Sequence, residues 1–282
     1  MVSKLKVNML GSGNVATHLA MALNDAGHTV CGIYSRQKAH AEELAGRLKQ
    51  SSRSERDVCA VDKLSALPVA DVYAFAVRDA VLADLAERLR SSLPEAVCRN
   101  ALFLHTAGSM PIDVLSQRFA LSAVMYPLQT FSKTASLDFG QVPLFVEGNC
   151  PQSEQAVEEI AHNLSCKVTH LDGNGRKRIH LAGVFANNFT NHMCQVACDL
   201  LQDSGIDPTC LLPILDETVR KLHTMPPRQA QTGPAVRWDR NVMDMHRRML
   251  DGQPALQQIY EDISQSIHQT VMSHDQLRPD KN

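Results

Sequence analysis

A short glycine-containing segment, "GSGNVA", lies near the start of the sequence and has the composition of a phosphate-binding turn. Gly11 allows a tight turn, Gly13 lets the backbone approach a pyrophosphate, and Ala16 permits close packing of the helix that follows. A helix that begins at Asn14 would direct its free amide groups and the positive end of its dipole at the phosphates. The predicted contacts to a bound dinucleotide are Gly11, Ser12, Gly13, Asn14 and Val15.

Further along, the apolar run "TVCGIY" is followed by "SRQ". In dinucleotide-binding folds this position binds the adenosine ribose. An acidic side chain there would accept hydrogen bonds from the ribose hydroxyls of NAD. Ser35 and Arg36 instead provide a hydroxyl group and a fixed cation, which suit a 2'-phosphate. The segment therefore predicts NADP as the cofactor. The alternative is that Arg36 is only a solvated cation at the start of a helix.

Two later segments, "FAVRDA" and "HTAGS", each follow a predicted strand. In a parallel sheet such strand ends line the crevice in which a ligand lies. The predicted contacts to the nicotinamide ribose are Val77, Arg78, Thr106 and Ala107; the alternative is that these residues only begin turns. For His105, a buried strand position and a functional role both stay open.

The helical segment "HLAGVFANNFTNH" places polar residues among apolar ones. Four side chains recur at spacings of three and four, so a regular helix would bring them to one face. They are His180, Val184, Asn187 and Asn191, and Asn188 lies alongside. An imidazole suits proton donation during hydride transfer, and an Asn amide holds a carbonyl or imine without titrating.

This helical segment predicts His180 as the acid/base, Asn188 as an orienting donor, and Asn187 and Asn191 as substrate contacts. The alternative is a structural polar seam at a helical dimer interface. Further on, "QTGPAVRWD" places Arg237 beside an aromatic ring, an arrangement that could clamp a substrate carboxylate. Arg237 is therefore predicted as a substrate contact. The alternative is that Arg237 and the aspartate of this segment pair with each other or cap the next helix.

The elements that must position these residues follow a clear pattern up to about residue 170, where short β-branched or aromatic runs alternate with helical periodicity. This alternation predicts an α/β fold with a Rossmann-type doubly wound parallel sheet. The predicted strands are "KVNML", "TVCGIY", "DVYAFAV", "ALFLHT", "SAVMYPL", "PLFVEG" and "KVTHL", with a short one in "CAVDKL". The predicted helices are 14–26, 37–49, 79–90 and 151–164.

After Leu171 the segment "DGNG" predicts a turn, and the rest of the chain shows helical periodicity with almost no strand pattern. We therefore expect two domains, a nucleotide-binding domain at residues 1–171 and an all-helical domain at residues 172–282. The first helix of the second domain is predicted at about 176–204.

The composition excludes several classes of protein. With 44% hydrophobic residues and a net charge of -2, the chain resembles ordinary globular proteins and gives no reason to expect nucleic acid as a partner. Its apolar runs are far shorter than the roughly 20 residues of a membrane helix, and no cleavable leader is apparent, so a cytoplasmic location without membrane attachment is predicted. Its 8 cysteines include no Cys-x-x-Cys pair, and in "HMCQVAC" His192 would point away from the two cysteines, so no metal site is predicted.

Seven segments together resemble one known family. They are "GSGNVATHLA", "YSR", "HTAGS", "YPLQTFS", "PLFVEG", "HLAGVFANNFTNH" and "QTGPAVRWD", and they span nearly the entire chain. The sequence is similar to the Rossmann-like proteins with a DUF2520 C-terminal domain, which are often described as related to NADP- or F420-dependent oxidoreductases. Two positions depart from the family pattern: Tyr126 stands where we expect His, and Trp238 where we expect Gly.

The resemblance implies an NADP-binding domain followed by a helical dimerisation domain, as in pyrroline-5-carboxylate reductase and the 6-phosphogluconate dehydrogenase-like group. In those relatives the active site lies between the domains, and the corresponding helix carries Lys and Asn. We therefore expect a homodimeric NADP-dependent oxidoreductase that acts on a small carbonyl, imine, or amino or hydroxy acid. The alternatives are a non-catalytic NADP-binding sensor or assembly protein, and an enzyme that uses F420 with NADP as its hydride partner.

Overall fold

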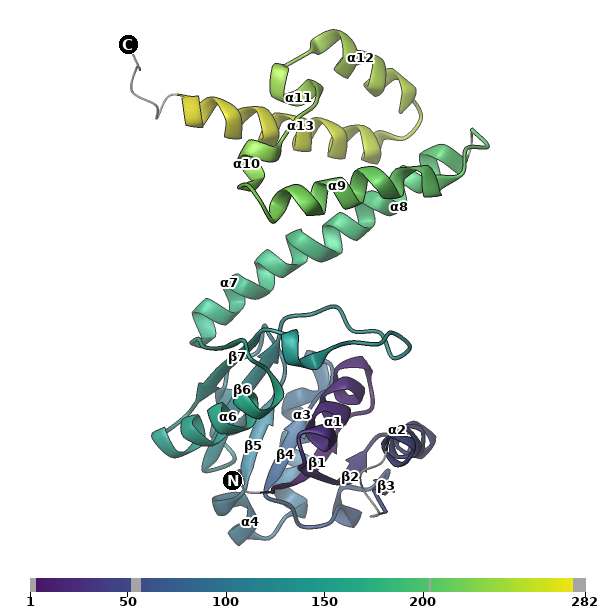
Figure 1. The fold of residues 1–282 in the computed structure, drawn as a ribbon. Coiled ribbons are helices and arrows are strands. Elements are labelled where there is room, and N and C mark those ends of the chain that lie inside the picture. The colour runs from purple at the N-terminus through teal and green to yellow at the C-terminus, as the bar shows by residue number, and fades with distance from the viewer. Residues whose placement is uncertain (1–3, 52–56, 203, 276–282) are drawn as a thin grey trace. The chain divides into compact units, whose positions relative to one another are not determined.

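The structure is a computed structural model that describes residues 4–51, 57–202 and 204–275. The chain forms two compact units, Met1–Met193 and Cys194–Asn282. The first contains the whole sheet and the second is built from helices (Figure 1). The predicted domain boundary, at residue 171, lies before a long helical segment. The two compact units instead divide within that segment, after Met193.

In its described residues, the first unit contains one sheet of eight strands in the order β3-β2-β1-β4-β5-β6-β7-β8. Its strands are β1 (Lys6–Leu10), β2 (Thr29–Tyr34), β3 (Cys59–Val61), β4 (Val72–Phe75), β5 (Leu102–His105), β6 (Leu121–Pro127), β7 (Leu144–Gly148) and β8 (Val168–His170). The chain runs outward from β1 through β2 to β3 and then resumes on the other side of β1 with β4. The carboxyl ends of β1 and β4 therefore form the switch point at which doubly wound sheets bind ligands.

The prediction of a wholly parallel sheet is wrong at one strand, because β7 runs antiparallel to β6. The connection between these two strands, residues 128–143, contains only the 3-10 turn η2 (Phe139–Gln141). A parallel pair needs a crossover, usually helical, that carries the chain back to the starting edge, and this connection has no such helix. The chain therefore turns back directly, and the remaining strand pairs are parallel.

Helices cover both faces of the sheet, as the doubly wound prediction requires (Figure 1). On one face, α1 (Asn14–Asp25), α2 (Lys38–Gln50) and α6 (Pro151–Leu164) share a core with alternate strand residues such as Met9 and Ala74. On the other face, α3 (Asp79–Ser92), α4 (Glu95–Asn100), α5 (Asp113–Ser116) and the turn η1 (Leu64–Ala66) pack on the intervening residues, such as Leu10 and Phe75. The two-residue repeat of the strands thus separates the two cores.

The long helical segment after the sheet comprises α7 (Gly173–Gly183), the π-helical turn η3 (Val184–Phe189) and α8 (Thr190–Gln202). The "DGNG" segment does not precede this helix as a separate turn. The Asp172 carboxylate instead accepts a hydrogen bond from the backbone amide of Gly175 (2.7 Å) and caps the helix. The helix therefore begins three residues earlier than predicted, because an Asp N-cap satisfies an amide group that a helix start leaves free.

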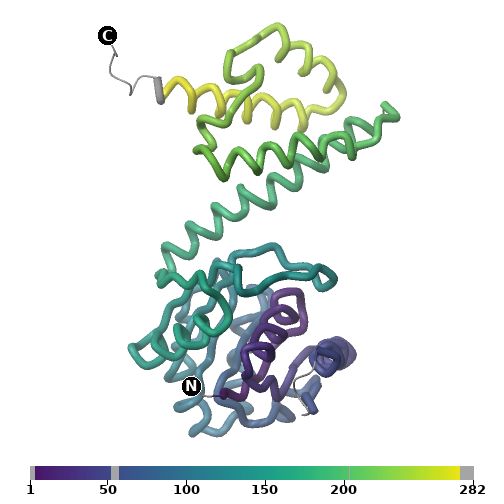
Figure 2. Tube along the Cα trace, viewed as in Figure 1, coloured from purple at the N-terminus to yellow at the C-terminus, as the bar shows by residue number. Residues whose placement is uncertain are grey.

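The second unit contains η4 (Pro208–Leu211), α9 (Leu212–Leu222), α10 (Pro227–Ala230), α11 (Pro234–Arg237), α12 (Arg240–Met249) and α13 (Pro254–Asp275). Their succession can be followed along the Cα trace (Figure 2). Trp238 ends α11 with a left-handed φ of 52° and stacks on His268 at a ring separation of 4.4 Å. Within the described ranges of the chain, no helix is long and apolar enough to cross a membrane.

Candidate functional site

The glycine-containing turn lies between the ends of β1 and α1 and has the geometry that its sequence predicts. Gly11 has a φ of 125°, and a Cβ there would lie 2.2 Å from the carbonyl oxygen of Ala76, so only glycine fits. Its amide donates to the carbonyl of Tyr34 (2.9 Å). Gly13 precedes α1, no side chain caps this helix, and a Cβ at Gly13 would meet no atom within 4 Å. The first amide groups of α1 are thus open to a ligand.

A cavity of about 550 Å³ opens over this turn. All the residues predicted to hold the cofactor line it: Gly11, Ser12, Gly13, Asn14, Val15, Ser35, Arg36, Val77, Arg78, Thr106 and Ala107. They come from the loops that follow β1, β2, β4 and β5. His180 of α7 lines the same cavity. The fold therefore gathers the predicted phosphate, ribose and proton-transfer groups into one space.

Two arginine side chains line the cavity close to the residues that end and follow β2. Arg36 is exposed at the start of the β2–α2 connection, and Arg88 of α3 also lines the cavity. The Arg88 guanidinium lies 3.5 Å from the hydroxyl oxygen of Tyr34 and pairs with Asp84 at 3.5 Å. Arg88 was not among the residues predicted from the sequence. The available signal was its place on the helix that follows the strand paired with β1.

Buried polar contacts hold the loop after β5. The Thr106 amide and hydroxyl both donate to the carbonyl of Phe75 (3.1 and 3.3 Å). His105 is fully buried, and its Nδ1 accepts from the Ala107 amide (3.2 Å). Burial, together with the nearby Arg176 cation, lowers the pKa of His105 to about 3. The neutral His105 side chain therefore stabilises the loop through its hydrogen bond with the Ala107 amide. It is not among the residues that line the cavity.

A buried ion pair fixes the start of α7. The Arg176 side chain is only 1% exposed and pairs with Glu147 of β7, which is 17% exposed. Its other terminal nitrogen donates to the carbonyl of Met110 (2.7 Å). Arg176 and His180 are four residues apart and so lie on the same face of the helix. The ion pair thus connects β7, the loop after β5 and the position of His180. Neither partner was predicted from the sequence.

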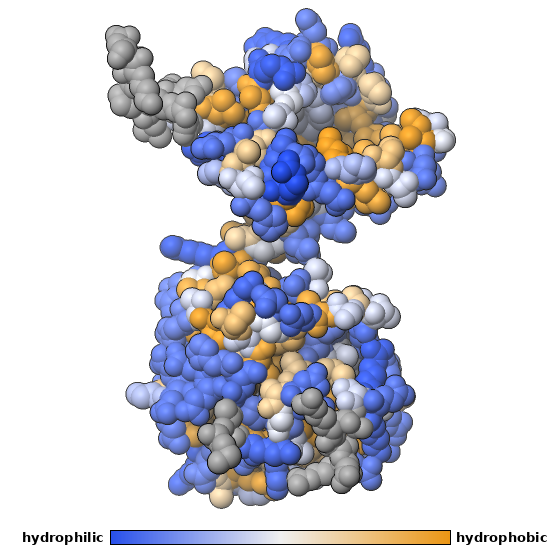
Figure 3. Space-filling model, in the orientation of Figure 1, coloured by the Kyte–Doolittle hydropathy of each residue, from blue (hydrophilic) through white to orange (hydrophobic). Residues whose placement is uncertain are grey.

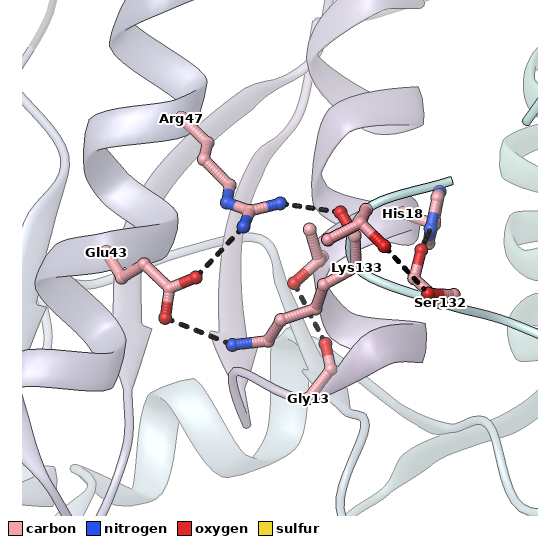
Figure 4. A network of polar contacts seen from close by, with 8 residues as sticks. Gly13, His18, Glu43, Arg47, Ser132 and Lys133 are labelled. Atoms are coloured by element: carbon pink, nitrogen blue, oxygen red, sulfur yellow. Dashed lines mark hydrogen bonds and ion pairs between the residues drawn. The ribbon is translucent and has the colours of Figure 1, made fainter. Parts of the chain in front are cut away.

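The loop between β6 and η2, residues 128–138, lies against the first two helices of the sheet domain (Figure 4). Three donors from those helices bind its backbone carbonyls. Asn14 donates to Phe131 (2.8 Å), His18 Nε2 to Ser132 (2.8 Å) and Arg47 to Lys133 (2.7 Å).

The Lys133 side chain of the same loop pairs with Glu43 at 3.1 Å, and this ammonium holds the pKa of Glu43 below its usual value. The side-chain amide of Asn14, in the first turn of α1 and next to the glycine-containing turn, is already hydrogen-bonded to this loop. The contacts fix the start of α1, which bears the free amide groups of the cavity.

The remaining predicted residues lie elsewhere. Asn187, Asn188 and Asn191 are exposed and are not among the residues that line the cavity. The π-helical turn η3 breaks the three-and-four spacing that was assumed to align Asn187 and Asn191 with His180, because its hydrogen-bond ring is wider. Arg237 is exposed and belongs to the second unit.

The aspartate of the "QTGPAVRWD" segment, Asp239, caps α12 by accepting from the Val242 amide at 3.3 Å, as one of the two alternatives for this segment expects. In the part of the chain that the structure describes, no group of three or more His, Cys, Asp or Glu side chains could hold a metal ion.

Comparison with known proteins identifies the family of this chain. A model of Rossmann-like domains matches residues 1–127, and a model of a domain of unknown function, DUF2520, matches residues 142–267. A protein from Bacteroides fragilis, provisionally named an NADP oxidoreductase, is 37% identical, with a TM-score of 0.85 over 94% of this chain and 98% of that one. The chain belongs to the family of Rossmann-like proteins that carry a DUF2520 domain.

More distant structures share the fold alone. A protein from Thermotoga maritima is 20% identical with a TM-score of 0.69, over 95% of this chain and 99% of that one. A reductive aminase from Aspergillus terreus, in complex with NADPH and ethyl levulinate, is 14% identical with a TM-score of 0.65, over 98% of this chain and 100% of that one. None of the curated proteins matches the chain in sequence.

Proposed function

We propose that the protein is an NADP-dependent oxidoreductase that acts on a small carbonyl, imine, or amino or hydroxy acid. The observation that carries the proposal is the convergence on one cavity of His180 and the segments that follow four strands, with open space beside Gly13, where a Cβ would meet no atom within 4 Å. The relatives add support, because the Bacteroides fragilis protein is named for NADP and the Aspergillus terreus enzyme is complexed with NADPH. When bound, the nicotinamide supplies or accepts the hydride, and the chain supplies orientation and a proton.

The preference for NADP rests on two arginine side chains that line the cavity. Arg36 and Arg88 provide two guanidinium groups, and Ser35 provides a hydroxyl, where NAD-binding proteins place a carboxylate. Such groups match the doubly charged 2'-phosphate by charge-assisted hydrogen bonds. Two carboxylates, Asp79 and Asp84, oppose this preference because they also line the cavity, but Asp84 is paired with Arg88 and Asp79 accepts a hydrogen bond from the Ser109 hydroxyl.

His180 is proposed as the acid/base, because it is the one histidine among the described residues that lines the cavity. An imidazole changes charge near neutral pH and so suits proton transfer to or from a substrate oxygen or nitrogen. Asn188 as orienting donor, and Asn187, Asn191 and Arg237 as substrate contacts, remain part of the proposal. Each requires a ligand contact outside the cavity described above, so single Ala variants assayed for the KM of the substrate test them separately.

The proposed quaternary structure is a homodimer formed through the helical domain. Four large apolar side chains recur along one face of α9, and all are exposed: Leu212, Leu215, Val219 and Leu222. Hydrophobic residues are visible on the surface of this helical region (Figure 3). Contiguous exposed apolar area of this kind marks an interaction surface. Light scattering is expected to show a dimer for the natural chain and a monomer for Val219→Lys; a natural chain that is monomeric at all concentrations contradicts the proposal.

The first experiment is a fluorescence titration of the purified protein with NADPH and NADH, followed by an NADPH consumption assay with keto acids and cyclic imines. We expect NADPH to bind more tightly than NADH and at least one substrate class to turn over. Tight binding without turnover favours the sensor function, turnover only with a deazaflavin favours the F420 alternative, and no binding of either nucleotide overturns the proposal.

A further inference from the structure

A second polar side chain meets the imidazole of His180. The hydroxyl oxygen of Tyr126, near the end of β6, lies 3.1 Å from Nδ1 of His180. The two rings stand edge to face, with centroids 5.9 Å apart and an interplanar angle of 72°. The pair joins residues 54 positions apart in the sequence, and nothing in the local pattern of either segment predicts it.

Gly108 places this pair at the wall of the cavity. A Cβ at Gly108 would lie 2.8 Å from Cζ of Tyr126 and 2.9 Å from Nδ1 of His180. Gly108 and His180 both line the cavity, so the Tyr126 hydroxyl lies directly behind that lining. Any larger residue at position 108 would push the tyrosine and the histidine apart.

The direction of the hydrogen bond follows from what the hydroxyl can reach. Among the residues that the structure describes, Nδ1 of His180 is the one hydrogen-bond partner of the Tyr126 hydroxyl. A half-buried O–H group without an acceptor is costly, so the hydroxyl donates to Nδ1. Burial raises the pKa of Tyr126, which keeps its proton in place at neutral pH. When Nδ1 accepts, a neutral imidazole carries its own proton on Nε2.

We propose that Tyr126 is a positioning residue that holds neutral His180 in the tautomer protonated at Nε2. The inference rests on the proposed function and narrows the role of His180 to that of a hydrogen-bond donor. A neutral imidazole protonated at Nε2 has no lone pair there with which to act as a base, and loss of that proton would leave an imidazolate. With Nδ1 engaged by Tyr126, the ring has Nε2–H as its free donor, and no described residue accepts from it. A donor suits the oxygen of a carbonyl or the nitrogen of an imine, so the arrangement favours binding of the oxidised form of the substrate.

A second tyrosine–histidine pair supplies a matched control. In the helical unit, Nδ1 of His246 lies 2.9 Å from the hydroxyl oxygen of Tyr260, and the rings are 5.7 Å apart at 86°. The geometry is nearly the same as that of the first pair, but neither residue is among those that line the cavity. Tyr260→Phe therefore removes the same hydroxyl contact away from the proposed site.

The experiment is nitrogen-15 NMR of histidine-labelled protein at about pH 8, above the ordinary histidine pKa of about 6.5. His180→Asn identifies the His180 signals by their disappearance. We expect the natural chain to show His180 protonated at Nε2, and Tyr126→Phe to show a mixture of tautomers. Tyr260→Phe should change only His246. Because phenylalanine keeps the ring and removes only the hydroxyl, the Tyr126→Phe variant is expected to fold.

Two results overturn the proposal: His180 protonated at Nδ1 in the natural chain, or an unchanged tautomer in Tyr126→Phe. The same samples are titrated with NADPH, and we expect the Kd of Tyr126→Phe to stay within about twofold of that of the natural chain, a shift below 0.5 kcal/mol. Absence of NADPH binding in the natural chain would refute the proposed function while leaving the tautomer result intact, so the two failures are distinguishable.

Discussion

Removing the Arg176 side chain is the most direct test of how the site is held. Arg176→Met keeps much of the side-chain volume but leaves Glu147 without its cation and the Met110 carbonyl without its donor. Breaking a buried ion pair by removing one partner costs about 3–5 kcal/mol. Since Glu147 keeps 17% of its side chain exposed, we expect the lower end, about 3 kcal/mol. Domains have a total stability of about 5–15 kcal/mol, so the loss is large.

The assay is urea unfolding of the natural chain and Arg176→Met, followed by circular dichroism and by tryptophan fluorescence. Trp238 is the one tryptophan of the sequence and lies in the helical unit, so its fluorescence reports that unit. We expect the circular dichroism transition of the sheet-containing unit to move to lower urea with little change in slope. The NADPH affinity should fall as well, because the loop after β5 and His180 lose their common anchor.

Lys177 provides the control, since it is exposed on the same helix and Lys177→Met should change the unfolding free energy by less than about 0.5 kcal/mol. The double variant Arg176→Met/Glu147→Gln removes the charge on both sides and should cost less than the sum of the single variants, because neither leaves a buried charge unpaired. A cost below about 1 kcal/mol for Arg176→Met, or strict additivity, would refute the view that this ion pair holds α7 on the sheet.

Three further predictions concern the cavity and its surroundings. Arg36→Asp should weaken NADPH binding by roughly 10–100-fold while leaving NADH binding little changed, because a charge-assisted hydrogen bond contributes about 1.5–3 kcal/mol; equal losses for both nucleotides, or an effect of the same size from Arg99→Asp on α4, would contradict the assignment. Gly11→Ala should unfold or strongly destabilise the sheet domain because its Cβ would meet the Ala76 carbonyl at 2.2 Å, whereas Gly13→Ala should fold normally and lose cofactor affinity, as thermal melts and NADPH titrations of the two variants will show. His105 has a pKa of about 3 in the folded chain, whereas in the unfolded chain it takes up a proton near pH 6.5. The free energy of unfolding should therefore decrease as the pH falls through this window, by about 2 kcal/mol between pH 6.5 and 5. His105→Asn should remove that part of the pH dependence in urea titrations; if the free energy of unfolding of the variant depends on pH as it does in the natural chain, another group causes the effect.

The parts of the site that could be predicted from the sequence are those whose signal is local. Each such prediction needs only a strand end and the few residues beyond it. The residues predicted in this way are those of the glycine-containing turn, Arg36 and the residues after β4 and β5, and all of them line the cavity. The doubly wound architecture is likewise confirmed, because alternating strand and helix patterns determine it. The antiparallel direction of β7 was not predicted. It depends on the connection between β6 and β7, and the composition of that connection does not differ from that of other loops.

What could not be predicted depends on contacts between distant residues. Tyr126 reaches His180 across 54 positions, and Arg176 reaches Met110 across 66. In a single sequence Tyr126 and Arg176 do not differ from the many polar residues that face solvent, and nothing marks Met110 as the source of an acceptor carbonyl. The π-helical turn was missed for a different reason: the spacing argument assumes a regular α-helix, and one wider turn is enough to shift Asn187 and Asn191 from the face that carries His180.

The β6–η2 loop has an implication for how this protein tolerates sequence change. The loop contributes backbone carbonyls to α1 and α2, and the donors Asn14, His18 and Arg47 belong to the helices. Every residue type has a carbonyl, so substitutions at Ser132 should leave the docking of the loop intact, whereas shortening or lengthening the loop would move all three acceptors out of reach. An engineer should therefore preserve the length of this loop, and the side chain of Lys133, which pairs with Glu43.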